Sequence, residues 1–570
     1  MATVNQSQAS YVIEEHPLNE PRPIRIIVVG AGAAGINFAY ATKKYLRNVT
    51  LVIYEKNAAI GGTWLENKSA TPTPFLIRTE LTQDRYPGIR CDNPSHNYQL
   101  SWSLNPNWKI LRYFQDTAKN HDLEKYVKLK HKVTGTVWSE EDGTWTVDVQ
   151  DEATGEVFKD RGEFLINASG FLNNWKWPDV PGLKTFEGQL VHTANWKEDI
   201  SLQGKKVAII GNGSTAIQLL PEIQSEAQQV INFIRSPTWI TPSFAQKHAG
   251  PGGTNFQYSK EQKKEFKNDP IKFSKYRKAI EEEISATFGL VLKDSDAQAQ
   301  AKALLTEYMK HKLGKDSLLA NRLVPDFGVL CRRASPGIGY LEALNEENVR
   351  VVLDPIDSVV KDGIRVKTGE TIPFDVLICA TGFDLSWKPR FPILGLHGTN
   401  LQAQYDVRPI GYLGVCAPNM PNYFVYFGPN SPLAHGSALP SFEHITTYMI
   451  RMIYKAQTEG YHSFEPSAKA TSDFTEHCDA FFPRTIWSTK CRSWFKGGRE
   501  DGPVYALHPG SRAHWFHMMN EPRYEDYIWK STNKNRFAYL GNGFSLREVE
   551  GKDMTWFLDE PEAGYKPVFY

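Results

Sequence analysis

Two glycine-rich turns, each directly after a short apolar stretch, constrain the fold of this chain more than any other feature. They read GAGAAG at residues 30–35 and GNGSTA at residues 211–216, and a stretch that can form a helix follows each turn. Glycine lets the backbone approach a pyrophosphate, and the N-terminus of the following helix offers free N–H groups to it. The pattern predicts an α/β fold with two Rossmann-like dinucleotide-binding domains. The residues expected to cradle the two pyrophosphates are Gly30, Gly32, Gly35, Gly211, Gly213, Ser214 and Thr215.

The residue that ends the strand after each turn distinguishes the two predicted nucleotides. The strand at residues 50–54 ends in Glu55, whose carboxylate can accept hydrogen bonds from a ribose diol. The strand at residues 230–234 ends in Arg235 and Ser236, with no acid there to repel a 2′-phosphate. We therefore expect FAD in the first site and NADPH in the second. The alternative for Arg235 is a solvated surface arginine.

Length and composition favour a multidomain protein that acts on small molecules. With 570 residues, 41% of them hydrophobic, the chain can form two or three domains. A net charge of +1 provides no overall field to attract nucleic acid or anionic lipid. The polar residues 1–24 predict an N-terminal extension, and no run of eighteen apolar residues occurs, so we expect a cytoplasmic protein. The six cysteines form no CxxC pair and no metal-ligand spacing, which argues against a dithiol reductase.

Two strands that end in small residues mark where the chain is expected to leave one sheet and later return to it. Residues 164–166 lead into NASG, and residues 375–379 lead into ATG. These points predict an NADPH-binding domain at residues 176–384 that is inserted in a discontinuous FAD-binding domain. The two parts of the FAD-binding domain are then residues 25–175 and 385–570, and the second part contains a control loop.

A change of composition within the predicted insert indicates a small helical subdomain at about residues 243–324. This region is rich in Lys, Glu and Ala. Apolar residues recur at every fourth position in it, which predicts one buried helical stripe. The stripe consists of Tyr276, Ile280, Ile284 and Phe288. The alternative for this region is a role in binding a partner.

The segment between the two turns contains a specific pattern, FxGxxxHxxxW at residues 186–196. On this pattern and the two turns, residues 24–527 resemble the Baeyer–Villiger monooxygenases of the class B two-Rossmann flavoproteins. The related N- and S-oxidising flavin monooxygenases usually end the pattern in Tyr or Phe, so Trp196 favours the Baeyer–Villiger family. Lys197 departs from the family's usual Pro or Asp. The resemblance implies that His192 lies in the connection between domains and has a conformational role in catalysis, not that of a general base.

A second pattern of this family reads GGxW, four residues, and then YPGxxxD. Here GGTW at residues 61–64 and YPGIRCD at residues 86–92 are separated by seventeen extra residues, 68–84. Deleting these residues restores the family pattern without a gap. One hypothesis is a genuine loop beside the flavin, which its threonines and prolines would make irregular. The other is a stretch of gene that is normally spliced out, since seventeen codons preserve the reading frame.

Oxygen insertion next to a ketone requires a fixed cation, because the attacking C4a-peroxyflavin and its adduct both carry negative oxygen. Arginine suits this role because it keeps its charge at working pH, and its planar fork can bond a carboxylate and an oxyanion together. Residues 326–333 (DFGVLCRR) are similar to the family segment that supplies this cation. The resemblance implies that Arg333 is the catalytic arginine, that Asp92 orients it, and that Arg332 meets the NADP 2′-phosphate. By themselves, two adjacent arginines would indicate a solvated loop.

Residues 491–495 (CRSWF) resemble the mobile control loop of the family, whose tryptophan closes over the bound cofactor. The resemblance implies a gating role for Trp494, and it implies that NADP stays bound after reducing the flavin. The alternative for Trp494 is an ordinary place in the hydrophobic core. The other residues expected to contact the cofactors are Lys56, Gly62, Thr63, Trp64, Tyr98, Thr381 and Asn430.

The expected function is therefore the NADPH- and O2-dependent conversion of a ketone to an ester or lactone by a monomer or weak oligomer. A first alternative is the oxidation of amines or sulfides by the same cofactors. A second is an uncoupled flavoprotein that senses NADPH or releases hydrogen peroxide.

Overall fold

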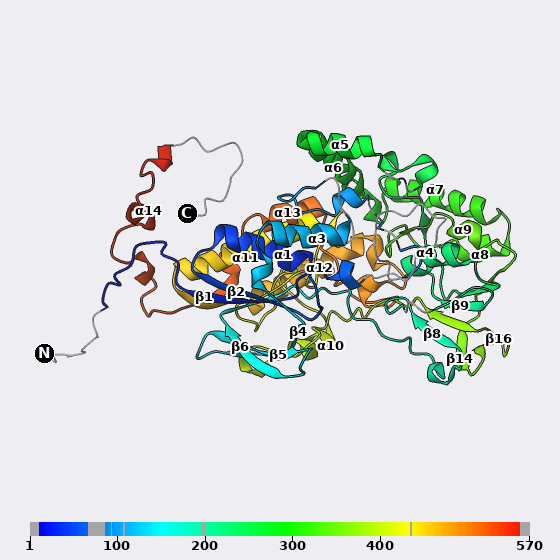
Figure 1. The fold of residues 1–570 in the computed structure, drawn as a ribbon, viewed down its shortest axis with the longest axis horizontal. Coiled ribbons are helices and arrows are strands. Elements are labelled where there is room, and N and C mark those ends of the chain that lie inside the picture. The colour runs from blue at the N-terminus through cyan, green and yellow to red at the C-terminus, as the bar shows by residue number, and fades with distance from the viewer. Residues whose placement is uncertain are drawn as a thin grey trace.

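The computed structural model describes residues 11–66, 86–89, 91–92, 94–105, 109–196, 200–254, 256, 258–433 and 436–558. Within these ranges, two parallel sheets lie toward opposite ends of an elongated molecule, with helices above both and smaller sheets below (Figure 1). No helix in the described ranges is long and apolar enough to cross a membrane.

The first sheet has five parallel strands, and its central strand β1 (Ile24–Val29) leads directly into the first glycine-rich turn. The strand order is β19-β7-β1-β2-β3. The other strands are β2 (Val49–Glu55), β3 (Val127–Leu129), β7 (Phe164–Asn167) and β19 (Tyr423–Val425). Most residues of β1 are buried on both faces, as expected for a parallel sheet that is covered on both sides.

Different elements cover the two faces of the first sheet. Ile26 and Val28 of β1 pack in one core with α1 (Ala33–Tyr45) and α11 (Ala438–Thr458). Ile27 and Val29 point to the opposite face. They pack with a smaller covering sheet of order β18-β4-β5-β6. Figure 1 shows these helices and this sheet on opposite sides of β1 and β2. The strands of the covering sheet are β4 (His131–Ser139), β5 (Thr144–Asp151), β6 (Val157–Gly162) and β18 (Ile393–Leu394).

The second parallel sheet repeats this plan around the second glycine-rich turn. Its order is β13-β10-β9-β17-β8. The strands are β8 (Gln189–His192), β9 (Lys206–Ile210), β10 (Gln229–Phe233), β13 (Val349–Val352) and β17 (Val376–Cys379). Val207 and Ile209 of β9 pack with α4 (Ser214–Ile223) and α9 (Tyr340–Ala343), whereas Ala208 faces a three-stranded sheet. That sheet consists of β14 (Ile356–Val360), β15 (Gly363–Val366) and β16 (Thr371–Pro373).

Two segments connect the parallel sheets, and they lie side by side. The chain leaves the first sheet after β7 and comes back to it at β19, with the whole second sheet in between. The outgoing and returning segments form a bridge between Trp175 and Phe383. Arg390 of the returning segment donates to Phe171 O (3.0 Å) and Asn173 Oδ1 (2.9 Å) of the outgoing one. These contacts fix the connection close to the ends of β7 and β17.

Four of the described helices lie at residues 260–323, within the region where the composition predicts helices. They are α5 (Lys260–Asn268), α6 (Pro270–Ser285), α7 (Asp296–Leu313) and α8 (Leu318–Leu323). Ile280 and Ile284 of α6 are buried as predicted. The prediction is wrong for Phe288, because α6 ends at Ser285 and Phe288 begins a short 3-10 helix that packs in a different core.

The remaining elements lie around the two parallel sheets and near the ends of the chain. The helices are α2 (Thr63–Glu66), α3 (Ile110–Asn120), α10 (Leu401–Val407), α12 (Ala468–Phe481), α13 (Arg512–Met519) and α14 (Leu546–Val549). The strands are β11 (Ile240–Thr241), β12 (Ser335–Pro336), β20 (Tyr461–Pro466) and β21 (Tyr527–Ser531).

Candidate active site

A cavity of ≈ 1470 Å³ extends from the first glycine-rich turn to the second. This exceeds the roughly 300–1,000 Å³ of a site for one small molecule, so the cavity has room for more than one bound group. The predicted site residues that line it are Gly30, Gly32, Glu55, Lys56, Gly62, Thr63, Trp64, Asp92, Tyr98, His192, Ser214, Thr215, Arg333 and Trp494. Those outside its lining are Gly35, Gly211, Gly213, Arg235, Ser236, Arg332, Thr381 and Asn430. The extra residues 68–84 lie outside the described ranges.

The first turn requires glycine for two reasons. Gly30 has φ +104°, and a Cβ there would lie 2.7 Å from Ala168 O. A Cβ on Gly35 would lie 2.1 Å from Gly30 O, and one on Gly62 would lie 2.9 Å from the Cα of Gly32. The turn, the helix after it and the GG segment therefore pack backbone against backbone, which leaves a shallow cradle over the start of α1.

Glu55 ends β2 beside this cradle and is 4% exposed. One carboxylate oxygen accepts the N–H of Ala31 within the turn (2.8 Å), and the other accepts the N–H of Asn57 (2.8 Å). The side chain therefore fixes the turn to the end of β2 and also lines the cavity. This placement fits a nucleotide whose ribose lies over the strand end.

The second turn has the same backbone form as the first, but the space around its second glycine is open. Gly211 has φ +123°, and a Cβ there would lie 2.6 Å from Ala380 O. Apart from Gly213 itself and its immediate chain neighbours, no described residue comes within 4 Å of the position that a Cβ on Gly213 would take. No side chain caps α1 at Gly32 or α4 at Gly213 in the described structure, so both helices present N–H groups that a phosphate can accept.

A group of arginines lies beyond the second turn, at the end of β10. Arg332 donates to Ser236 Oγ (3.4 Å), and it also donates to Pro237 O and Thr238 Oγ1. Burial, and then the charge of Arg235, lowers the pKa of Arg332 to about 10. Burial, and then the charge of Arg492, lowers the pKa of Arg235. No carboxylate in the described part of the chain offsets either shift, so this group of like charges fits an anionic ligand such as a phosphate.

Arg333 lies on the cavity side of the same segment and pairs with Asp92. Its Nη2 donates to Asp92 Oδ2. The Asp92 side chain is 8% exposed, whereas the Arg333 side chain is 51% exposed. A buried carboxylate thus anchors a half-exposed guanidinium, and both residues line the cavity. Such an arrangement can bind a negative oxygen.

Trp494 closes one wall of the cavity. It lies at the start of a 3-10 helix, Trp494–Lys496, that is capped by the Ser493 hydroxyl. The indole stacks on Trp387 (centroids 5.9 Å apart) and on Phe171 (6.2 Å), which belong to the two connecting segments. Trp494 therefore belongs to an aromatic stack and also lines the cavity.

His192 ends β8 and is buried at the junction of the two sheets. Its Nδ1 accepts the N–H of Ala194 (3.1 Å), so the ring proton is on Nε2, which lies 3.3 Å from Thr381 Oγ1. The ring also stacks on Trp175 of the outgoing segment (4.7 Å). His192 thus ties β8 to the residues that follow β17 and to the connection, and Thr381 is engaged in this contact.

The remaining predicted residues are more peripheral. Lys56 pairs with Glu66 (2.9 Å), and Trp64 contacts Tyr98 edge to face (5.3 Å). Asn430 is buried in its turn, where its amide donates to Leu507 O (2.9 Å).

Comparison with known proteins agrees with this geometry. Residues 24–259 match the family model described as flavin-binding monooxygenase-like. The FAD-binding monooxygenase moxY of Dothistroma septosporum is 35% identical over 545 residues, which cover 93% of this chain and 83% of the relative. The chain belongs to the class B flavin monooxygenases. A Baeyer-Villiger monooxygenase of Pseudomonas aeruginosa is 26% identical over 486 residues, covering 83% of this chain and 85% of that protein.

Solved structures support the same assignment. The structure of cyclohexanone monooxygenase from Rhodococcus sp. Phi1 bound to NADP+ has a TM-score of 0.73 and 26% identity, and the match covers 90% of this chain and all of that one. The predicted two-Rossmann fold is confirmed, and FAD and NADP(H) are the cofactors of the monooxygenase.

Several contacts that hold together segments around the cavity were not predicted from sequence. Glu281 of α6 accepts hydrogen bonds from Asn97 Nδ2 (2.8 Å) and Ser437 Oγ (2.6 Å), and it pairs with Arg512. Burial by itself would raise the pKa of Glu281, but Arg512 and Ser437 outweigh this and lower it. A disulfide between Cys331 and Cys491 joins two more segments of the site. Both features join residues far apart in the chain, which no local pattern signals.

Proposed function

We propose that this monooxygenase inserts one oxygen atom next to a ketone carbonyl and gives an ester or a lactone, using NADPH and O2. The observation that supports this most strongly is the Arg333–Asp92 pair at the cavity between the two turns. Attack on a carbonyl carbon places negative charge on oxygen, and a fixed guanidinium stabilises it without any change of protonation. FAD, once reduced by NADPH, supplies the activation of O2.

Asp92 is proposed to orient the arginine. Its burial and its ion pair restrict the guanidinium to a small set of positions, so that little reorganisation is needed when charge develops on the substrate. Trp494 is proposed to gate the cavity and exclude water, because its stack on Trp387 and Phe171 can open by movement of the short segment that contains it. His192 is proposed to set the relative position of the two sheets and thereby affect catalysis indirectly.

We propose that the first turn binds FAD and the second binds NADPH. Support comes from Glu55 beside the first cradle and from Arg235, Ser236 and Arg332 beyond the second. In this proposal the NADPH-binding domain spans residues 176–384. The remaining FAD contacts would come from the residues that line the cavity near the first turn, namely Lys56, Gly62, Thr63, Trp64 and Tyr98. Thr381 and Asn430 would act through the backbone turns that they stabilise.

The substrate is proposed to be a small-molecule ketone, and the protein a cytoplasmic monomer or weak oligomer. Apolar side chains from several segments, including Leu433, Phe442, Ile284 and Leu290, line the cavity, which suits an uncharged substrate. The proposal is compatible with either hypothesis for residues 68–84, and sequencing of the mature transcript distinguishes the two.

The test is an assay of the purified flavoprotein with NADPH, a panel of ketones, and a matched panel of amines and sulfides. Product and hydrogen peroxide are measured together. We expect ester or lactone from at least one ketone, with little peroxide. Sulfoxide or N-oxide as the main product would favour heteroatom oxidation. Peroxide equal to the NADPH consumed, with every substrate, would indicate an uncoupled oxidase; either result would overturn the proposal.

A further inference from the structure

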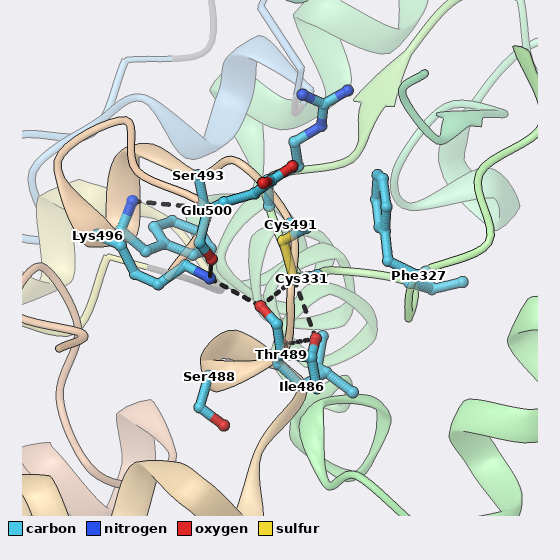
Figure 2. Close-up of a disulfide and its surroundings, with 12 residues drawn as sticks. Phe327, Cys331, Ile486, Ser488, Thr489, Cys491, Ser493, Lys496 and Glu500 are labelled. Atoms are coloured by element: carbon cyan, nitrogen blue, oxygen red, sulfur yellow. Dashed lines mark hydrogen bonds between the residues drawn. A yellow bond between two sulfur atoms is a disulfide. The ribbon is translucent and has the colours of Figure 1, made fainter. Parts of the chain in front are cut away.

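The disulfide between Cys331 and Cys491 joins the segment that contains the site arginines to the segment that contains Trp494 (Figure 2). The two cysteines are 160 residues apart in the chain. They are 0% and 3% exposed and belong to one apolar core with Phe482, Ile486 and Trp487. The bond therefore fixes two otherwise separate segments to each other inside the protein.

Each of these cysteines is followed directly by an arginine, Arg332 or Arg492. Arg332 donates to the Ser236 hydroxyl, the Pro237 carbonyl and the Thr238 hydroxyl, shortly after the end of β10. Arg492 is close enough to Arg235 for its charge to lower the pKa of that residue. The disulfide thus holds two guanidiniums, from two distant segments, beside the third one at Arg235. A bound anion would offset the mutual repulsion of these guanidiniums, and a phosphate monoester supplies up to two negative charges.

Other contacts would keep the core intact if the bond were opened. Lys496 is buried and donates to Thr489 O (2.7 Å) and to Glu500 O, which closes the segment on itself (Figure 2). The Sγ of Cys331 lies 3.3 Å from Thr489 Oγ1, so a thiol there has a polar partner. Arg492 donates to Gly498 O of the same segment (3.0 Å), so we expect loss of the bond to let this segment shift together with Arg492 while the aromatic core around it stays folded.

We propose that this disulfide is a redox-controlled clamp on the NADPH 2′-phosphate site, and that Arg492 is a third phosphate-binding residue. With the bond closed, Arg235, Arg332 and Arg492 surround the phosphate. A dithiol reductant donates two electrons and two protons to the bond, which becomes two thiols while the reductant becomes a disulfide. Arg492 then moves away, and the preference for NADPH over NADH falls. In a cytoplasmic enzyme, disulfides that do form are commonly redox-sensing. The inference rests on the proposed assignment of NADPH to the second turn.

The test measures nucleotide binding to the FAD-loaded protein, without any ketone. Alkylation and peptide mass mapping, before and after treatment with dithiothreitol, report whether Cys331 and Cys491 are joined. Calorimetric titration then gives the dissociation constants for NADP+ and NAD+ in both states. We expect reduction to weaken NADP+ binding about tenfold or more, as for the loss of one charge-assisted contact, and to leave NAD+ binding unchanged.

Variants distinguish a role of the disulfide in phosphate binding from a general role in packing. Arg492→Ala and the double variant Cys331→Ala/Cys491→Ala should both match the reduced wild type and no longer respond to dithiothreitol. Cys478→Ala removes a buried free thiol from the same core and should behave as the wild type does, including its response to the reductant. If the double variant fails to fold, reduction of the wild type and Arg492→Ala remain decisive.

Three results would overturn the inference: no joined peptide in the untreated protein, unchanged NADP+ affinity after reduction, or equal weakening of NADP+ and NAD+. The last result would mean that the bond only maintains the fold. The inference and the proposed function can fail separately. A protein that converts no ketone can still bind NADP+ more weakly after reduction while its affinity for NAD+ stays unchanged.

Discussion

The two parallel sheets of this monooxygenase have the same plan, and their charges differ at the end of the strand after each glycine-rich turn. In the first, Glu55 is buried and both of its oxygens accept backbone N–H groups, so the acid is part of the scaffold as well as of the cavity wall. In the second, the corresponding region presents Arg235 and Ser236, and Arg332 joins them from a distant segment. We propose that the shared backbone offers N–H groups to a pyrophosphate in both sheets, and that the charge after the strand discriminates between the nucleotides.

The comparison also shows how each sheet depends on distant parts of the chain. Around the first cradle, Glu55 and Gly62 are close in sequence to the turn, whereas Ala168, which packs against Gly30, comes from a more distant part of the chain. We propose that the second is completed by residues 332–333 and 491–494, whose segments the disulfide joins. We therefore expect substitutions at the first turn to abolish cofactor retention, and substitutions at the second to change nucleotide preference.

Of the substitutions that test this comparison, Glu55→Ala is expected to have the largest effect. The change removes the acceptor of two N–H groups, and a lost partner for a buried donor costs about 1–3 kcal/mol each, in addition to lost ribose contacts. We expect the variant to be purified largely without FAD, which the flavin absorbance of the purified protein measures. Glu156→Ala, on an exposed loop, is the control and should retain its flavin. Full flavin content in Glu55→Ala would contradict the role given to the first turn.

Arg235→Ala is expected to have a smaller and more selective effect. Loss of one charge-assisted contact to the 2′-phosphate costs about 1.5–3 kcal/mol, or roughly 10- to 150-fold in affinity. The KM for NADPH should rise by this factor and the KM for NADH should hardly change, as measured by initial rates with each nucleotide. An equal change for both would show that Arg235 is a surface arginine with no part in nucleotide preference.

Glu281→Gln tests the contact between α6 and the elements that surround the first parallel sheet. We expect it to have the smallest effect of these substitutions. Because the folded-state pKa of Glu281 is lowered, its ionisation stabilises the fold at neutral pH, and this contribution is lost as pH falls through the folded pKa. Glu281→Gln should lower the unfolding temperature and the free energy of unfolding at pH 7. The expected loss of free energy is about 1–3 kcal/mol, as for a hydrogen-bonded charge.

The difference between Glu281→Gln and the wild type should shrink in acid, below the ordinary pKa of 4.5, in thermal unfolding followed across pH. Glu282→Gln changes the adjacent exposed carboxyl and serves as the control. A difference that stays constant with pH would mean that the charge of Glu281 does not contribute to stability.

Local features of the sequence predicted the turns, because the strand, glycine turn and helix that form each one are contiguous. The prediction of a helical apolar stripe was wrong at Phe288, because the sequence pattern continues beyond Ser285, where the helix ends. The pairing of Arg333 with Asp92 joins residues 241 apart and was expected from the family resemblance alone. The Glu281–Arg512 pair and the disulfide have no comparable pattern, because tertiary packing alone brings their members together.

The most direct test of the central claim is the yield of ester or lactone per NADPH consumed by Arg333→Ala, with Arg161→Ala as an exposed arginine control. Loss of one preorganised donor to a developing oxyanion costs about 10²–10³ in rate. The account predicts that product falls by this factor while NADPH oxidation continues and its electrons appear as hydrogen peroxide. Formation of ester by Arg333→Ala at the parent rate would contradict it.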